Sequence, residues 1–226
     1  MSRVRLLVGW VAGLSILVGV VGRSPDAPVL LASESRAFAL NLHFTSFATL
    51  SAGSRAALMT EAESIWKAGH VRLKWLREST EADEGPILRV VVLARPASSR
   101  AENSPWAVAE LMRPEGAAPL AIASTIGARR VVDEGRWEFS LEPAPVRDHR
   151  FGLVLGRALA HEIGHYLLQT NTHARQGLMR ATIDVREFGD LRSGPFRLDQ
   201  AAEAYMAIIA ANGALLSGAR PFSYSR

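Results

Sequence analysis

The sequence predicts an α+β fold, in which helices flank a mixed β-sheet and one long helix lies in the C-terminal half. Three observations lead to this prediction. Short segments in the first half alternate between apolar and polar residues, as strands do. The segment 87–94 (ILRVVVLA) is β-rich and mostly apolar, which is typical of a central strand. Residues 148–168 have the apolar spacing of a long helix. The resulting order, β-α-β-β followed by β-β-α-α, is that of an α+β domain.

The first elements follow from alternation and capping signals. Residues 37–45 and 71–76 alternate well enough to be strands, each with one buried face. Between them, 51–68 is predicted to be a helix with Ser51 as its N-cap. Gly69 is expected to end this helix as a left-handed residue.

The middle of the chain carries weaker signals. After the strand at 87–94, the region is rich in Pro, Ser and Ala, and we expect a short helix at 106–112. Two short apolar runs, 121–125 and 129–132, predict strands that pair with each other across a turn.

The helix at 148–168 starts from Asp148 as its cap, after two prolines that interrupt the chain. Its glycines Gly152 and Gly156 are spaced to allow close packing of another helix. A last helix is expected at 198–212, ended by Gly213.

Composition excludes several classes of function. The 226 residues are 48% hydrophobic and 21% charged, which is typical of a folded protein. The net charge is +4, but the arginines are scattered and do not form the basic patch expected of a nucleic-acid-binding surface. There is no cysteine, which rules out disulfides, thiolate metal ligands and a cysteine nucleophile.

The N-terminus predicts export. Arg3 and Arg5 precede an apolar run at 6–22, which is the pattern of a signal peptide. The run is of intermediate length, so it can also be an uncleaved membrane anchor. We therefore expect residues 1–32 to be a signal peptide or anchor with a linker, and 33–226 to be the catalytic domain. The expected location is periplasmic or extracellular, with a possible membrane tether.

The segment His161-Glu162-Ile163-Gly164-His165 carries the chemistry. On a helix, positions i and i+4 share a face, so both imidazoles can approach one metal ion. Zinc accepts imidazole nitrogens readily, and catalytic sites add a water to three protein ligands. Glu162 lies around the helix from the histidines and can take a proton from that water. We expect Zn²⁺ as the cofactor and Glu162 as the general base.

The third ligand is expected to be His173. It lies eight residues after His165, beyond the predicted end of the helix, and would complete an all-imidazole site. Carboxylates also bind zinc, so Asp184, Glu187 and Glu203 remain alternatives.

The arrangement HEIGHYLLQTNTH followed by GLM resembles the metzincin clan of zinc peptidases, and also a group of poorly characterised bacterial predicted zinc peptidases. The resemblance implies a zincin-like single domain. It makes His161, His165 and His173 the metal ligands, Glu162 the base, and Met179 the apolar floor beneath the histidines.

The motif departs from the clan pattern at two positions. The clan's glycine would fall on Leu168, and its third histidine on Asn171, two residues before His173. The loop after the helix must therefore take a different path.

These observations predict a zinc-dependent peptidase acting on a peptide or protein substrate. The peptide is expected to lie extended against a sheet edge formed by residues 121–132. Two alternatives remain: an exported, non-catalytic zinc-binding module, and a zinc hydrolase of a non-protein amide. A fourth protein ligand, for example Glu187, would favour the module.

Overall fold

A mixed β-sheet organises the part of the chain that the structure describes. This computed structural model describes residues 37–77, 85–96, 108–135, 141–192, 194, 196–212 and 222–224, all within one compact unit, Glu34–Arg226. Five strands form the sheet in the order β2-β1-β3-β5-β4. Four are parallel and β4 runs antiparallel to β5. The strands are β1 (Phe38–Ser46), β2 (Val71–Leu76), β3 (Ile87–Leu93), β4 (Ala109–Met112) and β5 (Leu120–Ser124).

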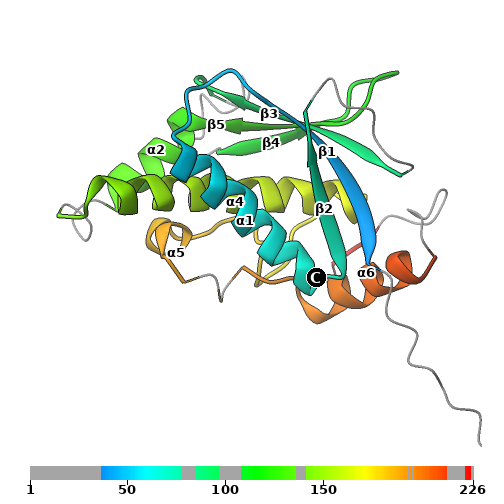
Figure 1. The fold of residues 1–226 in the computed structure, drawn as a ribbon. Helices are drawn as coiled ribbons and strands as arrows, with labels where there is room; N and C mark the ends of the chain where they lie inside the picture. Colours follow the sequence, from blue (N-terminus) through cyan, green and yellow to red (C-terminus); the bar gives the residue numbers. More distant parts are fainter. Residues whose placement is uncertain are drawn as a thin grey trace, which may run out of the picture. The chain divides into compact units, whose positions relative to one another are not determined.

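Two long helices cover one face of this sheet (Figure 1). They are α1, which connects β1 to β2, and α4, which follows the sheet in the sequence and contacts β4 and β5. The described helices are α1 (Ala52–Ala68), α2 (Thr125–Glu134), α4 (Ala144–Leu167), α5 (Val185–Gly189) and α6 (Gln200–Asn212). The predicted fold class, a mixed sheet with flanking helices and one long helix bearing the HExxH motif, is confirmed.

Helices α1 and α4 pack with their backbones in close contact. A β-carbon on Gly152 would lie 2.3 Å from the Ser54 carbonyl oxygen, and one on Gly156 would lie 2.6 Å from that of Leu58. Any larger residue at either glycine would push the helices apart. The close packing predicted for these two glycines is confirmed, and it sets the distance between α1 and α4.

The ends of α1 confirm one prediction and correct another. Ser51 is the N-cap, and its Oγ accepts a hydrogen bond of 3.1 Å from the Ser54 N–H. Gly69 is not left-handed (φ −86°), and His70 takes that conformation instead (φ 57°). Glycine at 69 serves close approach, because a β-carbon there would lie 2.9 Å from Cδ1 of Leu198.

The strand predicted at 129–132 is wrong, since these residues belong to helix α2. Ser124, the last residue of β5, caps α2 by accepting a hydrogen bond of 3.0 Å from the Gly127 N–H. Ala128 and Val131 are buried one turn apart. A short apolar run is compatible with either a strand or a helix, and here the serine cap and the i, i+3 burial produce the helix.

The helix predicted at 106–112 is also wrong over Ala109–Met112, which form the edge strand β4; residues 106 and 107 lie outside the described residues. Pairing with β5 overrides the weak helical preference of this stretch. The sheet edge expected at 121–132 is therefore wrong as well, because β5 lies between β3 and β4.

Helix α4 begins before the predicted cap at Asp148. Pro143 is its N-cap and Pro145 lies in its first turn, where a missing backbone N–H costs little. Helix α6 was predicted at 198–212 and begins at Gln200, whereas Gly213 lies outside the described residues. The apolar run at 6–22 also lies outside them. Among the residues described, no helix combines the length and apolarity needed to cross a membrane.

Candidate metal centre

Helix α4 places His161 and His165 one turn apart, with their rings facing the same point. The two Nε2 atoms are 3.0 Å apart. Two nitrogen ligands of a tetrahedral zinc ion, each at about 2.0–2.1 Å, would be separated by roughly 3.3 Å. The separation in the chain is therefore close to the value required of two ligands of one ion.

Hydrogen bonds at the opposite ring atoms determine the tautomers of both histidines. Nδ1 of His161 lies 2.8 Å from the carbonyl oxygen of Leu178, and Nδ1 of His165 lies 2.8 Å from that of Thr170. A carbonyl oxygen only accepts, so each Nδ1 must carry the proton. In the neutral rings, each Nε2 then presents a lone pair. Two lone pairs facing each other repel, and a cation between them removes that repulsion, so these residues fit a metal ion.

Burial keeps both rings neutral. Desolvation lowers the pKa of His161 to about 4 and that of His165 to about 4, although the hydrogen bonds to Leu178 and Thr170 act in the opposite direction. His165 is only 8% exposed. Neutral imidazole is the form that binds metals, so protons do not compete for these nitrogens near neutral pH.

His173 joins the two helix histidines from the loop after α4. The ligand atoms of the three histidines all lie within 4.8 Å of one another. The ring centroid of His173 is 5.3 Å from that of His161 and 4.9 Å from that of His165. The expected convergence of the three imidazoles is therefore present, and this group could hold a metal ion.

The loop returns to the site through a backbone conformation that the sequence pattern did not indicate. Gln169 is left-handed (φ 50°), so the chain reverses one residue after Leu168, where the clan pattern has glycine. The longer loop is then held by a local turn, in which Oγ1 of Thr170 accepts a hydrogen bond of 3.1 Å from the Thr172 N–H. This turn accommodates the two extra residues before His173.

The three carboxylates considered as alternative ligands do not belong to this group. Asp184 is the N-cap of α5 and accepts a hydrogen bond from the Arg186 N–H. Glu187 forms a two-pronged ion pair with Arg180. Glu203 lies in the first turn of α6. Glu187 is thus committed to a cation, which weighs against a closed site with Glu187 as the fourth ligand.

Glu162 lies beside the histidines and is almost enclosed, with 9% of its surface exposed. Burial raises the pKa of its carboxyl group to about 7, and the charge of Glu110 adds to this effect. A hydrogen bond from the backbone N–H of Leu111 acts in the opposite direction. Leu111 belongs to β4, so the edge strand holds the carboxylate in position.

Met179 packs directly beneath the helix segment that carries the motif. It is 1% exposed, and a β-carbon on Gly164 would lie 2.3 Å from its Sδ atom. Gly164 therefore makes room for the methionine between the two turns that carry His161 and His165. This is the position expected for the apolar floor of the site.

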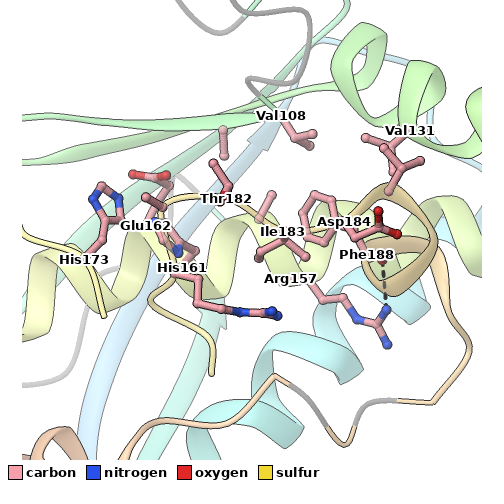
Figure 2. Close-up of a pocket in the computed structure, with 15 residues that line it drawn as sticks. Val108, Val131, Arg157, His161, Glu162, His173, Thr182, Ile183, Asp184 and Phe188 are labelled. Carbon is pink, nitrogen blue, oxygen red and sulfur yellow. Dashed lines mark hydrogen bonds between the residues drawn. The ribbon is translucent and has the colours of Figure 1, made fainter. Parts of the chain in front are cut away.

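A cavity of about 550 Å³ opens beside the histidines. His161, Glu162 and His173 line one end of it, while Val131, Asp184 and Phe188 lie toward the other (Figure 2). Its size is within the range of roughly 300–1,000 Å³ typical of ligand pockets. The candidate centre therefore has both a metal-binding geometry and room for a substrate group.

Sequence reasoning missed Arg157, one turn before His161 on the same helix. It is 1% exposed and pairs with Glu61 of α1 at 2.7 Å. Its NH1 group donates to the carbonyl oxygens of Phe188 and Asp190, at 2.8 and 2.6 Å. The sequence did carry a signal for this residue, because Arg157 lies inside an apolar helical run. An arginine at a buried position needs partners for its charge and its hydrogen-bond donors.

Arg113 was missed as well. It follows β4, and its guanidinium donates a hydrogen bond of 2.6 Å to the carbonyl oxygen of His165. This contact ties the end of the edge strand to the last turn of α4. Nothing in the sequence around Arg113 indicated such a contact.

Comparisons with known proteins give limited results. No protein-family model matches the chain, and no curated protein matches it. Among solved structures, it is similar to archaemetzincin from Methanopyrus kandleri, with 12% sequence identity and a TM-score of 0.39. The match covers 78% of this chain and 97% of that one.

Proposed function

We propose that this protein is a zinc-dependent peptidase, with His161, His165 and His173 as metal ligands and Glu162 as the general base. One observation carries the proposal: three imidazoles converge beside a buried carboxylate, and the hydrogen bonds of His161 and His165 leave their Nε2 lone pairs facing each other at 3.0 Å. This combination is what hydrolysis by a metal-activated water requires.

Zinc bound at this site would supply a Lewis acid that makes a water molecule more acidic and polarises a carbonyl oxygen. The protein's own contribution is the proton transfer. The Glu162 carboxylate takes a proton from the attacking water and returns it to the leaving amine.

The edge strand β4 is suited to hold an extended peptide. One side of β4 pairs with β5, and no strand pairs with its other side among the described residues. Leu111, in the middle of β4, hydrogen-bonds to Glu162, so this edge borders the reacting groups. A peptide added here as a further strand would pass the site. The apolar run at 6–22 behind Arg3 and Arg5 supports export of the chain as part of the proposal.

The test combines metal analysis with peptide cleavage. We expect about one zinc per chain, and a large loss of zinc affinity in His173→Ala. Glu162→Gln should keep its zinc but cleave peptides slower by a factor of about 10²–10⁴. His149→Ala, an exposed histidine earlier on α4, is the matched control and should change neither property. Folded protein that takes up no zinc, or a Glu162→Gln variant that remains fully active, would contradict the proposal.

A further inference from the structure

The cavity beside the histidines is amphipathic. Its walls include Val108 before β4, Val131 on α2, and Ile183 and Phe188 around α5. Figure 2 shows Val108 and Ile183 between the motif residues at one end and Val131, Phe188 and Asp184 toward the other. An extended side chain with a long apolar stem would pass along these walls, and its tip would approach a carboxylate.

Two arginines also line the cavity, but both are already paired. Arg157 forms an ion pair with Glu61, whose carboxylate is 2.7 Å from its Nε. Arg180 forms its two-pronged pair with Glu187. Their charges are therefore balanced within the protein, and neither presents a free cation to a bound side chain.

Asp184 differs from these arginines. Its Oδ1 accepts a hydrogen bond of 2.9 Å from the Arg186 N–H, as a helix cap does. Asp184 is exposed, and within the part of the chain that the structure describes no cation pairs with it and its Oδ2 makes no hydrogen bond. Away from the motif residues, Asp184 is therefore the charge that this cavity leaves unbalanced.

We propose that this cavity binds the side chain of lysine or arginine next to the scissile bond, and that Asp184 selects it. This inference rests on the proposed function and deepens it by naming the substrate class. The methylene stem packs against Val108, Val131 and Phe188, while the ammonium or guanidinium group binds the free oxygen of Asp184. A glutamate side chain of the substrate in this cavity would be repelled by the Asp184 carboxylate, so peptides with glutamate at this position should bind weakly.

Binding of peptide hydroxamates tests this specificity without relying on catalysis. The zinc-loaded protein is titrated with three such ligands, which carry lysine, norleucine or glutamate next to the metal-binding group. Norleucine keeps most of the apolar stem of lysine without its charge. We expect the lysine ligand to bind roughly tenfold more tightly than the norleucine ligand, as a charge-assisted hydrogen bond at an accessible site predicts. The same side chains in cleavable peptides should give the same order of kcat/KM.

Asp184→Asn is the decisive variant. Asparagine is as good an N-cap as aspartate, so the substitution removes the charge and preserves the fold. It should bind the lysine and norleucine ligands equally. Asp184→Ser, also neutral and a good cap, should behave in the same way. Glu63→Gln removes one charge from the exposed face of α1 and should keep the preference for lysine.

The outcomes separate the two proposals. Equal binding of lysine and norleucine ligands by the wild type, with peptides still cleaved, would overturn the role of Asp184 and leave the peptidase. A lysine preference that Asp184→Asn abolishes, without any cleavage, would support the pocket and contradict the peptidase. If no hydroxamate binds to zinc-loaded protein, both are wrong.

Discussion

Gly164 and Met179 are in direct contact, and a β-carbon on Gly164 would come within 2.3 Å of the methionine sulfur. Glycine at the fourth position of the motif therefore leaves room for the methionine side chain. The methionine is 1% exposed and lies under the turns that carry the first two histidines. Met179 and the helix segment above it are therefore packed against each other at Gly164.

Gly164→Ala tests this fit. The methyl group must displace Met179, which should lower the free energy of unfolding by about 1–3 kcal/mol and weaken zinc binding as the histidine turns shift. Denaturant unfolding and zinc competition with a chelator measure the two effects. Gly194→Ala is the matched control, since nothing lies within 4 Å of a β-carbon there. An unchanged zinc affinity in Gly164→Ala would show that Met179 does not support the histidines.

Arg157→Met tests the buried link between α4 and the segment after α5. The substitution removes the cation from Glu61, which is 4% exposed, and the donor from the carbonyl oxygens of Phe188 and Asp190. Loss of one partner of a buried ion pair costs about 3–5 kcal/mol of unfolding free energy. Arg192→Met should have little effect, because its pair with Asp190 is exposed to solvent. Equal stability of the two variants would contradict this role of Arg157.

The stability of the metal-free protein should depend on pH through the site itself. His161 and His165 have pKa values of about 4 when folded, against 6.5 when unfolded, so unfolding takes up protons between these values. Their contribution to stability falls as the pH drops through this window. Glu162 opposes them, because its folded pKa is about 7 and its unfolded pKa is 4.5. The folded state holds that extra proton, and this contribution falls as the pH rises.

Two histidines act against one carboxyl group, so the three groups together should make the metal-free protein less stable at pH 5 than at pH 7. Glu162→Gln removes the opposing group, so unfolding of this variant should take up about one more proton than unfolding of the wild type. Its free energy of unfolding should therefore fall more steeply with decreasing pH. Denaturant unfolding in the presence of a chelator measures both slopes. Parallel slopes for the wild type and the variant would show that the pKa of Glu162 is not raised in the folded state.

Gln169→Gly tests the turn that leads to His173. Left-handed backbone is strained for glutamine, and glycine adopts it without that strain. We expect the free energy of unfolding to rise by up to about 1 kcal/mol. Asn171→Gly in the same loop, where the backbone is not left-handed, should instead lower it by about 0.5 kcal/mol. The reverse order in thermal or denaturant unfolding would contradict the strain at Gln169.

Local patterns were sufficient for much of the fold and for the three site residues on α4. The strands β1, β2, β3 and β5 were predictable because their alternation or apolar character is strong over several residues. Helical periodicity placed His161, Glu162 and His165 together, because residues one turn apart share a face whatever surrounds the helix. The close packing of Gly152 and Gly156 on α1 followed from their spacing alone.

The remaining features depend on contacts between distant parts of the chain. Ala109–Met112 is a strand because β5 lies beside it, and residues 129–132 are helical because Ser124 caps the preceding turn. The convergence of His173 depends on a left-handed glutamine that no local preference favours. Asp184 lines the cavity because the segment around α5 packs against α4, where Arg157 binds the carbonyl oxygens of Phe188 and Asp190. The local sequence determines the periodicity of helices and strands. The strand at 109–112, the position of His173 and the position of Asp184 depend instead on the free energy of many packing contacts between residues far apart in the chain.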